Sequence, residues 1–134
     1  MRISADLVCA SVAALDATAA IAELRELSTQ IESVVVAGRD GAVIASSVRE
    51  PTAERIAQAA QALVGGADQV RTDLGREALA QLQASTPDGS VFVVVDGTRM
   101  AVATTGTDPT VGLVFYDLKT LLRQIDGAGD DAAA

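Results

Sequence analysis

Residues 52–70 of the chain read TAERIAQAAQALVGGADQV, a stretch in which nearly every side chain is small or aliphatic. Apolar residues recur in it at steps of three and four, which places them on one face of an α-helix. The positions on this face are Ile56, Ala60, Leu63, Ala67 and Val70, and Ala53, Ala57 and Val64 widen it. Only a narrow polar strip is left for solvent. The pattern therefore predicts a helix over Thr52–Val70 that is covered on two sides.

The start and the interior of this helix carry further signals. Pro51 and Thr52 suit its start, because proline fits the first turn and a threonine hydroxyl can accept from unpaired backbone N–H groups. Gly65 and Gly66 lower helix stability by roughly 1 kcal/mol each relative to alanine. The helix alone leaves two interpretations open. Either the glycines allow close approach of another backbone, or they mark the fraying end of a central helix in a monomer.

The composition is that of one domain of ordinary size, with 134 residues of which 49% are hydrophobic and 2% aromatic. Its core is therefore expected to be aliphatic and rich in alanine. The net charge of −8 argues against nucleic acid and anionic membrane as partners, since Lys and Arg bind both. A protein or a basic ligand fits this charge better.

The sequence lacks the residue types and spacings of common active sites. It has no histidine and one cysteine, which removes the commonest general base, the commonest metal ligand and any intrachain disulfide. It contains no GxxxxGK[ST] phosphate loop and no GxSxG nucleophile elbow. Ser46-Ser47 and Arg99 are then better explained as a strand-end hydroxyl pair and a surface arginine than as catalytic groups. We predict a protein that is not an enzyme and uses no catalytic residue, metal or cofactor.

The two ends of the chain differ from the rest. Residues 1–14 contain a short apolar run that Asp6 interrupts and that is too short to span a bilayer. Val8 before Cys9 also fits a lipoprotein cleavage motif poorly. We expect a cytoplasmic protein without membrane insertion, whose residues 1–14 form an arm of undecided structure. Residues 127–134, GAGDDAAA, have nothing to bury and are expected to form a flexible acidic tail.

Between these ends, helical patterns alternate with short apolar runs. A first amphipathic helix is predicted from Asp16, capped by Asp16 or Thr18, and a last one from Asp108-Pro109, where proline follows a capping side chain. The apolar side of the first helix is expected to carry Ile21, Leu24, Leu27 and Ile31. Strands are predicted over residues 34–37, 43–47, 77–86, 91–95 and 100–104. The third of these alternates polar and apolar residues, which suits an edge strand. Asp-Gly pairs at 40–41, 88–89 and 96–97 indicate tight hairpins, because both residues tolerate positive φ.

The resulting order is α-β-β-α-β-β-β-α, and the sequence resembles the roadblock/dynein light-chain family over about residues 15–126. The resemblance rests on VVVAGRDGAVIASS in the first hairpin, the helix AERIAQAAQALV, the hairpin DGSVFVVVDGTRMAVATT and the closing VGLVFYDLKTLLRQI. It implies a roadblock-like α+β fold, in which a five-stranded antiparallel sheet is flanked by helices. It also implies a homodimer that pairs through the second helix and the third strand.

Bacterial and archaeal members of that family are described as regulators of Ras-like GTPases. The resemblance thus implies a homodimeric adaptor that binds a small Ras-like GTPase and modulates its activity or localisation. The alternative is a scaffold or sensory module of a signalling complex, for example with a sensor kinase, that binds no GTPase. We expect the dimer interface to include Ile56, Ala60, Leu63, Val64, Ala67, Ala80 and Leu82. We expect a partner to contact the polar helix residues Glu54, Arg55, Gln58 and Gln61.

Overall fold

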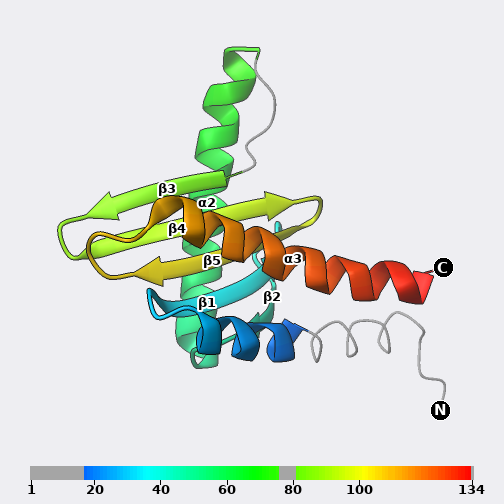
Figure 1. Ribbon diagram of the computed structural model, residues 1–134. Coiled ribbons are helices and arrows are strands. Elements are labelled where there is room, and N and C mark those ends of the chain that lie inside the picture. Colours follow the sequence, from blue (N-terminus) through cyan, green and yellow to red (C-terminus); the bar gives the residue numbers. More distant parts are fainter. Residues whose placement is uncertain (1–16, 76–80, 134) are drawn as a thin grey trace.

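The computed structural model describes residues 17–75 and 81–133, which form one sheet with helices on both faces (Figure 1). The predicted order of elements and the roadblock-like α+β fold are confirmed. The expected arm over residues 1–14, the expected cap Asp16 and residues 77–80 of the expected third strand, including Ala80, lie outside the described residues.

Five antiparallel strands make the sheet, in the spatial order β2-β1-β5-β4-β3. Their bounds are β1 Ile31–Gly38, β2 Val43–Ser46, β3 Gln81–Thr86, β4 Gly89–Asp96 and β5 Arg99–Thr105. Strands β2 and β3 therefore form the two edges, as the alternating pattern of β3 predicted. The predicted runs fall within or overlap each observed strand, since β-branched residues favour the pleated conformation.

The three Asp-Gly pairs lie at hairpin turns as predicted, but the glycines serve different needs. Gly41 and Gly97 have φ of 88° and 62°, a region that side chains with a Cβ rarely adopt. Gly89 begins β4 instead, and a Cβ added there would lie 2.2 Å from the carbonyl oxygen of Thr105. The third glycine is thus required by close packing of β5 rather than by turn geometry.

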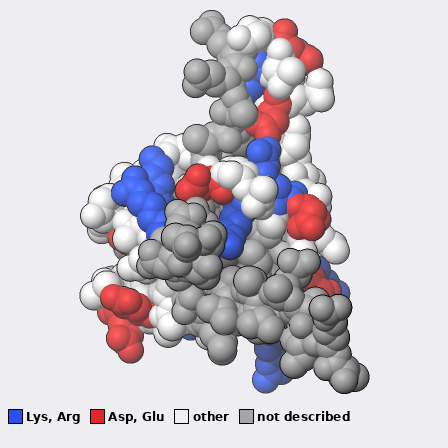
Figure 2. Space-filling view, turned by 90° about the vertical axis from the view of Figure 1, so that its right-hand side faces the viewer, with Lys and Arg blue, Asp and Glu red and all other residues white. Residues whose placement is uncertain are grey.

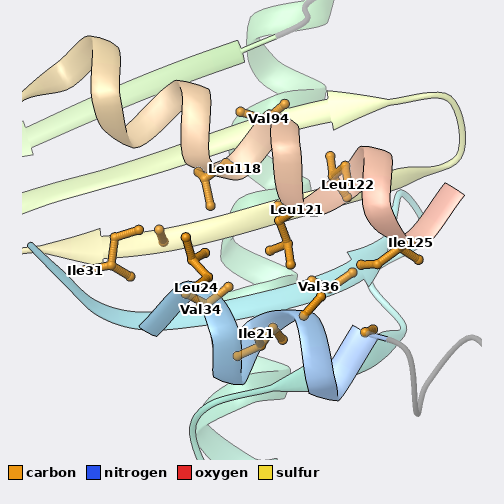
Figure 3. Close-up of a cluster of buried hydrophobic side chains, with 14 of the residues drawn as sticks. Ile21, Leu24, Ile31, Val34, Val36, Val94, Leu118, Leu121, Leu122 and Ile125 are labelled. Atoms are coloured by element: carbon orange, nitrogen blue, oxygen red, sulfur yellow. The ribbon is translucent and has the colours of Figure 1, made fainter. Parts of the chain in front are cut away.

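The helix over residues 17–27 and α3 (Val111–Ala133) cover one face of the sheet. Their apolar side chains meet those of β1 and β4 in an aliphatic core (Figure 3). Labelled members of this cluster are Ile21, Leu24, Ile31, Val34, Val36, Val94, Leu118, Leu121, Leu122 and Ile125. An edge-to-face contact between Phe92 and Phe115, with ring centroids 5.1 Å apart, extends it.

Helix α2 (Glu50–Asp73) covers the opposite face and contacts β1, β2 and β5. The cluster beneath it contains Val35, Ala37, Val93, Met100 and Val102 from the sheet. Because Val34 and Val36 point to the other core, the run of residues 34–37 is buried on both faces, as its unbroken apolar character predicted.

Two expectations about helix ends and faces are wrong. Leu27 is 78% exposed and Ile31 belongs to β1, because the first helix stops at residue 27 and the backbone N–H of Ser28 closes its last turn on Leu24. Asp108 has a φ of 56° and does not cap α3, which begins at Val111 with the Thr110 carbonyl accepting from Leu113 and Val114. At the far end, α3 continues as helix to Ala133, through residues expected to form a flexible tail.

No helix among the described residues is both long and apolar enough to cross a membrane.

Candidate self-association and partner surfaces

Helix α2 starts earlier and ends later than predicted. Its N-cap is Arg49, in an extended conformation and without a side-chain cap bond, and Pro51 lies in the first turn. The predicted capping role of Thr52 is therefore wrong, because Thr52 lies within the first turn; the first hydrogen bond of the helix runs from the N–H of Ala53 to the carbonyl of Arg49. At the other end, the N–H of Leu74 donates to Val70 and Gly75 leaves the helix with a φ of 70°. The helix is consequently long enough to extend past the sheet.

One side of α2 packs closely on the sheet through small residues. Its buried members are Ala53, Ala57, Ala60 and Val64, which follow the three- and four-residue spacing of one helical side. Ala60 is 1% exposed and Val64 is 5% exposed within the single chain. Both were expected in a dimer interface, yet they have almost no surface left for a second chain.

A second side of α2 is apolar but not covered, and we call it the apolar flank. It consists of Ile56, Leu63, Ala67, Val70 and the C-cap residue Leu74. Ile56 is half-buried against the sheet, whereas Leu63, Val70 and Leu74 are 42%, 58% and 68% exposed. The last turns of α2 extend beyond β3, so the sheet cannot cover them (Figure 1). The apolar flank is thus the largest set of exposed aliphatic side chains on α2.

The two glycines lie inside α2 and not at its end. A Cβ added to Gly65 or Gly66 would meet nothing within 4 Å. The structure therefore rules out a fraying helix end as their explanation, and nothing described in this chain approaches them closely. Successive residues of an α-helix lie about 100° apart around its axis. Gly66 therefore lies next to the apolar flank, whereas Gly65 lies on the side of the helix that faces away from it.

The third side of α2, which we call the polar flank, consists of Glu54, Gln58, Gln61 and Asp68. It faces the β1–β2 hairpin, where the guanidinium of Arg39 lies 2.6 Å from the carboxylate of Asp68. The side chain of Gln61 lies next to Gly41 in the same hairpin. Arg55 is exposed on the outer side of the helix, between the two flanks. The four residues expected to bind a partner are therefore all exposed, with Arg55 beside the polar flank.

Strand β3 provides a free edge of the sheet on the side where α2 projects. Leu82 is half-buried and packs against the cluster under α2, so the predicted interface residue faces the helix side. On its other face, the hydroxyl of Ser85 pairs with that of Ser90 at 3.1 Å. The edge backbone of β3 is paired only to β4 within the described chain.

Two exposed residues of the apolar flank were not among the predicted interface positions. Val70 was placed on the apolar face but not in the interface, and Leu74 lay beyond the predicted end of the helix at Val70. The steps from Leu63 through Ala67 and Val70 to Leu74 are four, three and four residues, so continuing the helical spacing could have identified both.

Charge is mixed on the described surface. Viewed from the end of the sheet, Lys and Arg are interspersed with Asp and Glu and form no continuous field of one sign (Figure 2). The described residues also contain no group of three or more His, Cys, Asp or Glu side chains that could hold a metal ion.

A family model described as Roadblock/LC7 domain matches residues 16–104. Among solved structures, a Roadblock/LC7 domain from Streptomyces avermitilis has a TM-score of 0.77 at 15% identity, covering 83% of this chain and 95% of that chain. MglB from Myxococcus xanthus has a TM-score of 0.76 at 13% identity, covering 88% of this chain and 90% of that chain. A structure described as MglB with tetrameric arrangement has a TM-score of 0.76 at 13% identity, covering 90% and 92%.

At these identities the solved structures establish likeness of fold. No curated protein matches the sequence significantly. The family model, in contrast, matches most of the chain, from the first helix to β5. The chain therefore belongs to the Roadblock/LC7 domain family.

Proposed function

We propose that this protein is a non-enzymatic homodimeric adaptor or regulator that binds a small Ras-like GTPase and modulates its activity or localisation. The observation that carries the proposal is the uncovered apolar flank of α2, with Leu63, Val70 and Leu74 between 42% and 68% exposed. Large exposed aliphatic side chains at helical spacing typically mark a protein interface. A second copy of the chain is the simplest partner, because an isologous contact uses the same flank twice.

The dimer would combine the apolar flank with the free edge of β3. Two β3 strands pairing edge to edge would satisfy backbone groups that water must otherwise solvate. Two projecting α2 helices would at the same time cover each other, and Gly66 would allow close approach. A specific interface of this kind buries on the order of 1,600 Å² in total. The tetrameric arrangement described for the similar MglB structure supports self-association of this fold.

The GTPase surface is proposed on the exposed polar residues of α2, namely Glu54, Arg55, Gln58 and Gln61. In a dimer, each would occur twice, on either side of the symmetry axis. Their charges and amides can pair with a polar partner surface, which is the usual make-up of a reversible interface. Membership in the Roadblock/LC7 family supports a GTPase as that partner.

The experiment retrieves the tagged protein from its native cells and identifies bound proteins by mass spectrometry. A co-purified GTPase is then titrated in its GDP and non-hydrolysable GTP-analogue forms, using fluorescence anisotropy. We expect Arg55→Glu to weaken binding at least roughly tenfold, as for an anchoring arginine, while leaving the dimer and the melting temperature nearly unchanged. Arg25→Glu is the matched control, since Arg25 is also exposed but lies on the helix over residues 17–27.

Two results would reject parts of the proposal. If the combined variant Arg55→Glu, Gln58→Ala and Gln61→Ala binds the GTPase as tightly as the wild type, the binding site lies elsewhere on the protein. Retrieval of a sensor kinase without any GTPase would favour the scaffold function. For the non-enzymatic role, we expect purified protein to hydrolyse neither nucleotide nor ester and to contain no stoichiometric metal by elemental analysis.

A further inference from the structure

A groove of about 570 Å³ runs along the free edge of β2. One wall is formed by all of β2 and the turn that precedes it, and the other by the first turns of α2, including Glu50, Glu54 and Gln58. The groove is thus the length of one short strand. It lies at the opposite edge of the sheet from β3 and is therefore separate from the proposed dimer surface.

The backbone of β2 offers hydrogen-bonding groups to this groove. The N–H of Ser47 donates to Val34, and the N–H of Gly38 donates to Ala42. Hydrogen-bonded and non-bonded pairs alternate along an antiparallel ladder. The intervening pairs, Ser46 with Val35 and Val43 with Ala37, are therefore the non-bonded ones. The backbone N–H and C=O groups of Val43 and Ser46 consequently point away from β1 and into the groove.

The ends of β2 limit how much chain the edge can accept. A register shift interrupts the ladder between Val36 and Ala37, and β2 is only 4 residues long. Beyond it, the hydroxyl of Ser46 accepts from the N–H of Val48, which turns the chain toward α2. Short, bulged edges resist open-ended sheet growth. The site is therefore suited to a single short strand and not to continued assembly.

The charges of the groove walls indicate which kind of peptide strand could bind there. Among the described residues, the charged ones in its walls are Glu50 and Glu54, and none of the described Lys or Arg residues lines it. We infer that the β2–α2 groove binds an extended segment of a partner protein that carries Lys or Arg at alternate positions and adds a sixth strand to the sheet. Side chains of a strand alternate between its two faces, so residues two apart would both lie on the α2 side near these glutamates. The inference does not depend on GTPase binding or on the dimer.

The test uses a capped hexapeptide, Thr-Lys-Val-Lys-Val-Thr, with backbone amide NMR shifts of the full-length protein and fluorescence anisotropy as readouts. We expect shifts confined to Val43–Ser46 and the start of α2. A peptide with Glu in place of Lys should bind at least tenfold more weakly, as should one N-methylated at its four central residues. The first change removes the charge match and the second removes the backbone donors.

Variants of the protein separate the groove from general charge effects. Glu50→Lys with Glu54→Lys should reverse the preference toward the Glu peptide. Glu23→Lys with Glu26→Lys changes the net charge equally on the helix over residues 17–27 and should leave binding at the groove unchanged. At the edge itself, Ser46→Pro removes an outward N–H and should abolish binding. Ser46→Ala keeps that N–H and should retain binding. Both substitutions remove the Ser46 hydroxyl that accepts from the N–H of Val48, so Ser46→Ala controls for the loss of that contact.

Several outcomes would overturn the inference. These are no binding of the Lys peptide at millimolar concentration, shifts on the α3 face, or equal weakening by both pairs of charge reversals. Protection of the Ser46 amide that appears at high protein concentration and disappears on dilution would instead assign the groove to a second copy of the chain. If the Ser46→Pro variant does not fold, the charge-reversal variants and the N-methylated peptide test the inference in its place.

Discussion

Replacing Leu74 by alanine should weaken the proposed dimer without unfolding the protomer. Leu74 is 68% exposed, and fully burying a leucine contributes about 1.5–3 kcal/mol, so the surface still to be buried corresponds to about 1–2 kcal/mol per protomer. In a twofold dimer the substitution occurs twice, which gives about 2–4 kcal/mol in the free energy of dissociation. The dissociation constant should therefore rise roughly 30-fold to 1,000-fold.

The protomer itself should be little affected by this change. The backbone N–H of Leu74 donates to the carbonyl of Val70 at the end of the helix, and an alanine at this position keeps that N–H. Exposed substitutions of this kind usually change folding stability by less than about 0.5 kcal/mol. Leu27→Ala is the matched control, because Leu27 is 78% exposed but lies on the opposite side of the sheet, next to α3.

Sedimentation velocity over a concentration series measures both variants against the wild type. We expect the Leu74→Ala boundary to shift toward the monomer at concentrations where wild type and Leu27→Ala remain dimeric. Equal dissociation constants for Leu74→Ala and wild type would refute the assignment of the apolar flank to the dimer interface. A wild-type chain that sediments as a monomer at micromolar concentration would refute the dimer itself.

Four further substitutions test other parts of the structure. Gly66→Ala should weaken the dimer although it favours the helix, whereas Gly65→Ala, turned away from the apolar flank, should raise the melting temperature with an unchanged dissociation constant. Leu121→Ala, at a position 2% exposed in the core of Figure 3, should cost about 2–5 kcal/mol of folding stability, measured by urea unfolding. Burial raises the pKa of the Asp117 carboxyl above its ordinary value of 3.8, so ionised Asp117 destabilises the folded state. Asp117→Asn should therefore raise the melting temperature at pH 7, and the gain should vanish as the pH falls below 3.8, where Asp117 is protonated in both states.

The strands and their turns could be predicted because their signals are local. Val34-Val35-Val36-Ala37 is β-branched and unbroken, and it is buried on both faces of the central region of the sheet. Gly41 and Gly97, the glycines of two Asp-Gly pairs, supply the positive φ that their turns use. The starts of helices were less predictable, because α2 begins after Arg49 without a side-chain cap and α3 begins at Val111, so neither start coincides with the capping side chain that the sequence offered.

The candidate interface was harder to predict, because two neighbouring sides of α2 are both apolar. The sequence pattern combined them into one wide face and could not decide which side meets the sheet. The structure buries the alanines: Ala60 is 1% exposed, whereas Leu63 is 42% exposed. Small side chains let the helix lie close to the sheet, and that closeness leaves the larger leucine at the margin. Ala60→Asp would therefore test folding of the protomer, while Leu63→Asp remains a test of association.

The three sides of α2 also explain how one helix could serve self-association and partner binding together. The apolar flank lies toward the turns that project past β3, whereas Glu54 and Gln58 lie near the start of the helix beside β2. Residues on the two flanks are separated around the helix by its angular phase, and Asp68 on the polar flank is already paired with Arg39. A second copy that covered Leu63, Val70 and Leu74 would thus leave the β2 edge and the polar residues of the first turns accessible. The angular spacing of residues around a helix places the apolar flank and the polar flank on different sides of α2. This spacing is kept along the whole helix because α2 continues without a break through Gly65 and Gly66, so a second copy and a partner could bind at the same time.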